Sequence, residues 1–102
     1  MSQVGEFEFA ASLWRYPGEQ GWHFVALPLD VAAEIDDLTT GLRRGFGSVK
    51  VVVTIGGSEW RTSLFPDSTR GTLLLPVKKA VRAAEQLDAD QDVSVHLRLA
   101  EL

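Results

Sequence analysis

The chain carries one strand–helix–strand pattern twice, and this internal repeat constrains its fold more than any other feature. An apolar strand, a Leu-Pro pair, a short helix, a loop and an alternating strand follow one another in approximately residues 22–55 and again in residues 72–99. The repeated pairs begin at Leu27 and Leu75, a spacing within the roughly 20–50 residues that are typical of internal duplications. The pattern predicts a pseudo-two-fold axis and leaves the function open.

Composition limits the class of protein. With 102 residues, 45% of them hydrophobic and 24% charged, the chain predicts one globular domain over residues 1–102. The absence of cysteine excludes disulfides, a thiol nucleophile and thiolate metal sites. No signal sequence and no membrane span can be recognised, so we expect a soluble, cytoplasmic protein. The formal net charge of −4 makes nucleic acid an unfavourable partner but leaves room for a local basic face.

The first half of the chain predicts a hairpin and a helix. Apolar residues alternate over Glu6–Trp14, and Trp22–Leu27 is the expected antiparallel partner of this strand. Asp30 is the expected N-cap of a short helix from about Val31 to Leu38. The glycine-rich segment 41–48 then predicts a loop.

Gly56 and Gly57 predict a tight hairpin between strands Val49–Ile55 and Ser58–Phe65. With these glycines at the centre of the turn, the register follows. The expected apolar face pairs Val53 with Trp60, Val51 with Thr62 and Val49 with Leu64, and the expected solvated face pairs Thr54 with Glu59, Val52 with Arg61 and Lys50 with Ser63.

The second half predicts a strand over Thr72–Leu75, a helix over Val77–Leu87 and a last strand over Val93–Leu99. The apolar stripe expected on this helix consists of Val77, Ala80, Val81, Ala84 and Leu87. The whole chain therefore predicts a mainly β domain with about six strands and two short helices.

Several sequence elements together resemble a known family. They are Phe9-Ala10-Ala11, Trp22–Pro28, Trp60-Arg61-Thr62-Ser63-Leu64, Gly71, Leu75-Pro76, Lys78-Lys79, Arg82 and Asp92–Val95. In this order they resemble the bacterial domain-of-unknown-function family 1905. The resemblance implies a fold similar to the double-split β-barrel of swapped-hairpin proteins, with both halves in one chain, and it brings no established activity. One departure is Gln91, which stands where the family tends to have glycine before the last strand.

A basic cluster is the first candidate site. Lys78, Lys79 and Arg82 fall in the first turns of the second expected helix, where the helix dipole and their mutual repulsion disfavour them slightly. One interpretation is a solvated helix face, and the other is a contact for an anion or an acidic partner. Arg43 and Arg44 either extend this patch or belong to a mobile loop.

Trp14 and Trp22 are candidate ligand-stacking residues, with packing at the barrel rim as the alternative. His23 and His96 lack the neighbours that a metal site requires, and no nucleophile or phosphate-loop motif is present. We therefore expect no catalytic residue, metal or cofactor.

The two expected helices differ in charge. Asp30, Glu34, Asp36 and Asp37 make the first acidic, whereas the second is basic. A swapped-hairpin DNA-binding surface needs both halves basic, so the acidic half disfavours duplex binding. Oppositely charged helices instead suit a charged protein partner or self-association.

We therefore expect a non-enzymatic interaction or ligand-binding module. The alternative is a nucleic-acid-binding regulator of the swapped-hairpin type that uses the basic helix face. A third hypothesis is a small enzyme with a pocket in the barrel mouth, where His23 or His96 would meet a carboxylate.

Overall fold

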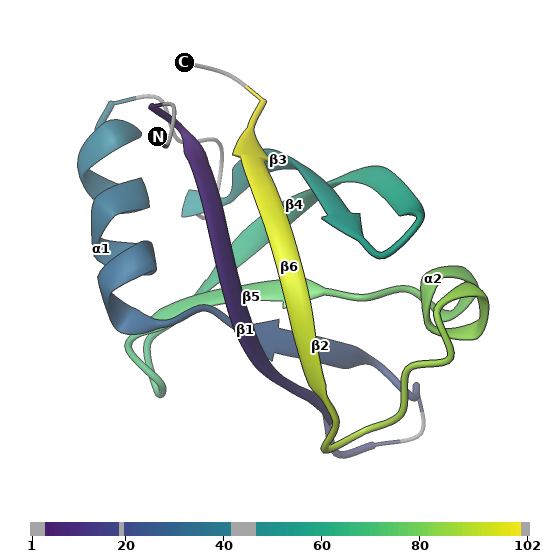
Figure 1. Ribbon diagram of the computed structural model, residues 1–102. Helices are drawn as coiled ribbons and strands as arrows, with labels where there is room; N and C mark the ends of the chain where they lie inside the picture. The colour runs from purple at the N-terminus through teal and green to yellow at the C-terminus, as the bar shows by residue number, and fades with distance from the viewer. Residues whose placement is uncertain (1–3, 19, 42–46, 101–102) are drawn as a thin grey trace.

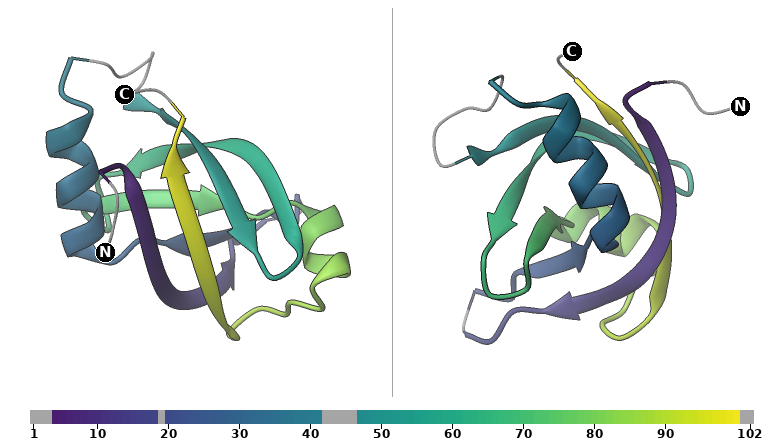
Figure 2. Two further views of the ribbon diagram at one scale, coloured as in Figure 1. Left: turned by 45° about the horizontal axis from the view of Figure 1, so that its top comes forward. Right: turned by 90° about the vertical axis from the view of Figure 1, so that its left-hand side faces the viewer.

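The computed structural model describes residues 4–18, 20–41 and 47–100, and within them six strands form a closed antiparallel barrel with two helices (Figure 1). Along the chain the elements are β1 Glu6–Arg15, β2 His23–Ala26, α1 Leu29–Leu38, β3 Val49–Ile55, β4 Ser58–Asp67, β5 Thr72–Pro76, α2 Lys79–Ala84 and β6 Asp92–Leu99. Around the barrel the order is β1-β2-β5-β4-β3-β6, with β6 returning to β1. The two helices lie at opposite ends of the barrel (Figures 1 and 2).

The strand pairings have a two-fold symmetry. Exchanging β1 with β4, β2 with β5 and β3 with β6 reproduces every pairing around the closed barrel. The same exchange carries α1, which follows β2, onto α2, which follows β5. The topology therefore accommodates two equivalent halves, while the duplication of residues 22–55 and 72–99 itself stays a prediction.

The core lies inside the barrel, where alternate strand residues point inward. Its most deeply buried side chains are Leu13, Val25, Ile35, Val51, Val53, Leu64, Leu75, Val77 and Leu97. Ile35 closes one end of the barrel from α1, and Val81 of α2 adds to the same cluster. Buried Thr72 donates its hydroxyl proton to the Leu27 carbonyl oxygen over 2.8 Å, which satisfies this polar group beside the core.

The central hairpin has the predicted register. All the expected pairs of β3 and β4 are present, from Val49 opposite Leu64 to Thr54 opposite Glu59. One expectation for the outer face was wrong, because Val52 is buried. It lies between Arg61 on β4 and Arg98 on β6, and a short side chain in a central strand is shielded by the aliphatic stems of such long neighbours.

The start of α1 differs from the prediction. The helix begins at Leu29 with Pro28 as N-cap, and the Pro28 carbonyl accepts the Ala32 N–H over 3.0 Å. Asp30 therefore lies within the first turn, where its charge suits the helix dipole, rather than at the cap. Neither helix in the described part of the chain has the length and hydrophobicity that crossing a bilayer requires.

Helix α2 is shorter than predicted at both ends: it begins at Lys79, because Lys78 is an extended N-cap, and the chain leaves the helix by Gln86. Gln86 has a φ of 54°, and the Leu87 N–H bonds back to the Arg82 carbonyl over 2.9 Å, as in a Schellman motif. Leu87 then packs on the core, whereas Ala80 and Ala84 of the expected apolar stripe are exposed.

The turn before β6 contains a left-handed residue that is not glycine. Asp90, not Gln91, adopts the left-handed conformation with a φ of 70°. Aspartate tolerates this region better than most side chains, which explains how the turn dispenses with the glycine usual in the resembling family.

Candidate functional site

Aromatic side chains gather on the outer surface of the barrel, where β1 and β2 pair. The Trp14 and Phe24 rings lie 5.4 Å apart between centroids, Tyr16 and Phe24 6.0 Å, and Trp22 and Phe24 6.1 Å. Phe24 is only 8% exposed although its neighbour Val25 is the residue that points into the barrel. Phe24 is thus buried by the other rings in a small apolar cluster outside the main core.

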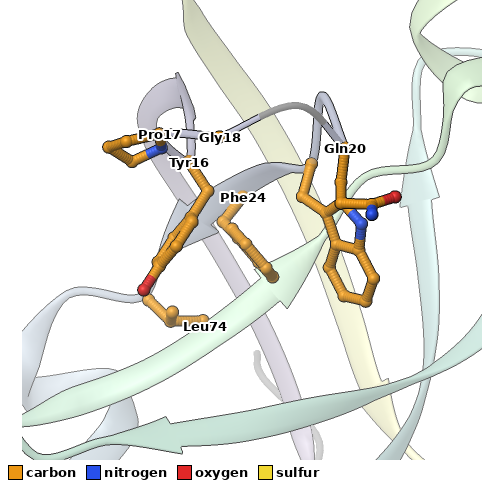
Figure 3. A pocket seen from close by; sticks show the side chains of 7 residues that line it. Tyr16, Pro17, Gly18, Gln20, Phe24 and Leu74 are labelled. Atoms are coloured by element: carbon orange, nitrogen blue, oxygen red, sulfur yellow. The ribbon is translucent and has the colours of Figure 1, made fainter.

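This cluster forms one wall of a hollow that we call the aromatic pocket. It has a volume of about 390 Å³. Its lining consists of Tyr16, Pro17, Gly18, Gln20, Trp22, Phe24 and Leu74. The side chains of Tyr16, Phe24 and Leu74 converge on this hollow (Figure 3). Trp22 is 57% exposed and Tyr16 is 50% exposed, so large apolar surfaces stay accessible there.

A second hollow, which we call the cationic groove, lies directly beside the aromatic pocket and shares Trp22 and Gln20 with it. Its volume is about 400 Å³. Its lining consists of Gln20, Gly21, Trp22, His23, Trp60, Arg61, Thr62, Pro76, Val77, Lys78, Lys79 and Arg82. Residues from β2, β4 and the β5–α2 junction therefore meet at one place on the barrel wall.

The β5–α2 junction is fixed by backbone bonds. Pro76 pairs with Phe24 at the end of β5, and the Val77 N–H donates to the His23 carbonyl over 2.9 Å. The side chain of Val77 is buried in the core, which leaves the next residue, Lys78, exposed at the start of α2. The lysines of α2 are thereby held beside His23.

Arg82 is oriented from within α2. Its Nε–H donates to the Val77 carbonyl over 3.2 Å, which folds the guanidinium back over the first turn of the helix. Val81, the neighbouring residue, is buried against the core. Arg82 is therefore a half-buried cation in a defined position rather than a freely rotating surface side chain.

Glu85 ties the far end of α2 to the central hairpin. Its carboxylate accepts the Ser58 hydroxyl proton over 2.6 Å and the Gly57 N–H over 3.2 Å. A helix of six residues is too short to be stable alone, so such tertiary bonds determine where it lies. Glu85 acts as a clamp between α2 and the β3–β4 turn.

The described carboxylates leave the positive charge of the cationic groove without an ion-pair partner. Its lining includes Arg61, Lys78, Lys79 and Arg82 and, among the described residues, no aspartate or glutamate. Arg70 and Asp67 form an ion pair outside the groove, and none of the groove cations has a described carboxylate within 4.0 Å. A protein with a formal net charge of −4 thus concentrates positive charge at one hollow.

His23 contributes an oriented imidazole ring to the groove lining. Its Nδ1 lies 2.7 Å from the Gly21 carbonyl oxygen, which can only accept, so Nδ1 carries the proton. This hydrogen bond sets the tautomer and the orientation of the ring.

The structure brings together some of the predicted site residues and separates others. Lys78, Lys79 and Arg82 share the cationic groove with Trp22, which was predicted separately as a stacking residue. Trp14 lines neither hollow, because the Arg70 guanidinium lies over its ring. Arg43 and Arg44 lie outside the described residues.

Arg61 and Trp60 were not predicted as site residues, and His23 was predicted only for an enzymatic pocket, yet all three line the cationic groove. The hairpin register had already placed Arg61 on the outer face of β4. Only the closure of the barrel, which brings α2 beside β4, shows that this arginine joins the lysines.

The described residues give less support to a metal site, to a site at His96 or to a contact through α1. They contain no cluster of three or more histidine, cysteine, aspartate or glutamate side chains that could hold a metal ion. His96 lies on β6 between Glu8 of β1 and Thr54 of β3, away from the groove. The acidic residues of α1 lie at the opposite end of the barrel from α2 (Figure 1). Head-to-tail self-association through these two helices stays a prediction.

Comparison with known proteins identifies one family. A family model described as "Domain of unknown function (DUF1905)" matches residues 9–97, which include both hollows and both helices. No curated protein matches the chain.

Proposed function

The chain belongs to the DUF1905 family, and we propose that it is a non-enzymatic binding module that takes an anionic ligand in the cationic groove. The family description assigns no activity, so the proposal rests on the site itself. Its ligand would carry a carboxylate or phosphate group within reach of Arg61, Lys79 and Arg82.

One observation carries the proposal. Cations from β4 and from α2, far apart in the sequence, line one hollow that the described carboxylates leave uncompensated. Gathering like charges costs free energy in the empty protein, and an anion would offset that cost. The alternative interpretation, a solvated helix face, does not require a hollow or an arginine held in one position. Arg82 is held in position by its hydrogen bond to the Val77 carbonyl.

The lining of the groove favours binding over catalysis. General acid–base chemistry requires a titratable group positioned beside the reacting atoms, often supported by a second group. His23 is the histidine of the groove, and the described lining brings no carboxylate to it. The arrangement supplies ligands for an anion rather than an acid–base pair.

A nucleic-acid-binding regulator is the competing proposal. The groove combines cations with Trp22 and Trp60, as in proteins that bind single strands by stacking and charge. Against it stands the acidic helix α1 with its exposed Asp30, Glu34 and Asp37, which would repel a phosphate backbone extending to that end of the barrel. A small anion would contact the groove alone.

The proposal can be tested by calorimetric titration with inorganic pyrophosphate at low and high salt. We expect saturable binding at one site that weakens as salt rises, because salt screens the charges involved. The Lys78→Glu plus Lys79→Glu variant should lose this binding. A matched control is Lys50→Glu plus Arg98→Glu, which changes the net charge equally but alters exposed residues outside the groove.

Two results would overturn the proposal. One is the absence of pyrophosphate binding to the folded wild-type protein at low salt. The other is an equal loss of binding in both charge-reversal variants, since this would show an effect of net charge alone. Tight, salt-dependent binding of a short single-stranded oligonucleotide, with no pyrophosphate binding, would favour the nucleic-acid regulator.

A further inference from the structure

The aromatic pocket and the cationic groove together define a ligand more narrowly than either does alone. The geometry points to an amphipathic anion, in which a hydrocarbon or aryl group is joined by a short linker to a carboxylate or phosphate. Its apolar part would fill the aromatic pocket while its charged part lies in the cationic groove. This inference rests on the proposed function and adds the chemical class of the ligand.

The aromatic pocket and the cationic groove are neighbours on the barrel surface. Trp22 and Gln20 belong to the lining of both hollows, so the two hollows adjoin at these residues. The volumes of about 390 Å³ and about 400 Å³ each lie in the range of small-molecule sites. One molecule with two unlike ends can therefore occupy both hollows across the Trp22 indole.

The polarity of the aromatic pocket is the second argument. Its side-chain polar groups are the Tyr16 hydroxyl, the Gln20 amide and the Trp22 indole N–H, all on exposed residues. The other lining side chains, Pro17, Phe24 and Leu74, are apolar. A nucleobase would bring several donors and acceptors that need partners once they leave water. A hydrocarbon or simple aryl group has no such requirement and gains from every apolar surface that it covers.

The shape is the third argument. The two hollows are concave and have the size of small-molecule sites, whereas stable protein partners generally need broad surfaces of about 800 Å² on each side. Phe24 already packs under the rings of Trp14, Tyr16 and Trp22, so the floor of the pocket is formed before any ligand arrives. A preformed floor reduces the ordering cost of binding.

A matched ligand series tests the inference by calorimetry at constant ionic strength. Inorganic phosphate carries the charged part alone, and phenyl phosphate adds an apolar ring. We expect phenyl phosphate to bind at least about tenfold more tightly, because the added ring buries apolar surface. Acetate and phenylacetate form a second pair with the same expected order.

Two single variants separate the hollows. Tyr16→Ala alters only the aromatic pocket and should abolish the advantage of phenyl phosphate while leaving phosphate affinity unchanged. Lys79→Ala alters only the cationic groove and should weaken both ligands by a similar factor. Both side chains are exposed, so thermal unfolding should show a folded protein in each case.

The source of the amphipathic anion is tested with vesicles. Cosedimentation with phosphatidylglycerol vesicles but not with phosphatidylcholine vesicles, and its loss in Tyr16→Ala, would support the inference with a membrane lipid as the source. Tight binding of phenyl phosphate without cosedimentation would support it with a free small molecule.

Equal affinity for phosphate and phenyl phosphate would overturn this inference and leave the proposed anion site standing. Failure of phosphate, pyrophosphate and phenyl phosphate alike would remove the proposed function as well. A ring-dependent gain that survives unchanged in Tyr16→Ala would place the apolar group elsewhere and also contradict the inference.

Discussion

The guanidinium carbon of Arg70 lies 4.1 Å from the centroid of the Trp14 ring, in cation–π geometry. The same guanidinium donates to the Asp67 carboxylate over 2.7 Å. Asp67 ends β4 and Arg70 lies in the turn that follows, whereas Trp14 lies near the end of β1. This contact joins the turn to the aromatic cluster and covers the Trp14 ring, which leaves Trp22 as the accessible indole beside the aromatic pocket.

The first prediction concerns the titration of Asp67. The side-chain hydrogen bond from Arg70 is the main cause that holds the pKa of Asp67 below its ordinary value of 3.8. Backbone N–H donors from Arg70 and Thr69 lower this pKa further, while burial opposes the shift. Because the folded-state pKa is lowered, the associated stability is fully present above pH 3.8 and is lost as the pH falls through the folded-state value.

Carboxyl-carbon NMR across this pH range checks the effect. Arg70→Ala should raise the pKa of Asp67 toward 3.8. Trp14→Leu, the control, removes the ring contact but keeps the hydrogen bond and should leave the pKa low. An unchanged titration in Arg70→Ala would contradict this explanation.

A second prediction distinguishes three glycines. Gly56 has a φ of 56°, and a Cβ there would meet the Glu85 carboxylate, whereas Gly71 has a φ of 67° with open space around it. Gly71→Ala should cost about 1–2 kcal/mol from backbone strain alone. Gly56→Ala should cost about 1 kcal/mol more, because Glu85 must give up its bonds to the turn.

Gly57→Ala is the control. Its φ is not positive and its Cβ would stand in ordinary contact with Glu85, so its cost should stay within about 0.5 kcal/mol. Urea unfolding of the three variants gives the comparison. Equal losses for Gly56→Ala and Gly71→Ala would show that the Glu85 clamp adds nothing to stability.

A third prediction concerns the end of α2, where Gln86 occupies a left-handed conformation that favours glycine. Gln86→Gly should raise the free energy of unfolding by up to about 1 kcal/mol. Ala83→Gly, at an exposed position inside the same helix, should lower it by about 0.5–1 kcal/mol. Substitution by glycine should therefore change the free energy of unfolding with opposite signs at two positions three residues apart. Thermal unfolding of both variants measures this difference. Destabilisation by Gln86→Gly would contradict the assigned helix end.

Local sequence signals predicted much of the fold. The glycine pair fixed the register of β3 and β4, because a two-residue turn leaves one pairing that puts Val51 and Val53 inside. The prediction for the C-terminal end of α2 was wrong. Apolar spacing continues through Leu87, whereas the backbone leaves the helix at Gln86. Leu87 contributes to the core from outside the helix, and periodicity alone does not distinguish these cases.

The site was only partly predictable for a different reason. Lys78, Lys79 and Arg82 are neighbours on one short segment, so their shared location follows from the sequence. Arg61 joins them only because β4 and the β5–α2 junction lie side by side once the barrel closes. Long-range pairings of this kind are set by packing of the whole domain.

A fourth prediction concerns the influence of Glu85 on ligand binding. Glu85 does not line the groove. If only screened charge mattered, removing this carboxylate would strengthen anion binding slightly. We nevertheless expect Glu85→Ala to weaken pyrophosphate binding several-fold, because α2 loses its bonds to Gly57 and Ser58 and presents Lys79 and Arg82 less precisely. Ser58→Ala, which removes one of these bonds without changing charge, should weaken binding less. Stronger binding in Glu85→Ala would show that charge, not helix position, governs affinity.

Amide chemical shifts followed during titration of the ¹⁵N-labelled protein with phenyl phosphate would locate the ligand on the barrel. We expect saturable changes at Trp22, His23, Arg61, Lys79 and Arg82, together with Tyr16 and Phe24 of the aromatic pocket. Helix α1, at the opposite end of the barrel, should show none. Changes centred on α1, or no saturable change at any position, would contradict the central claim that this groove binds an anion.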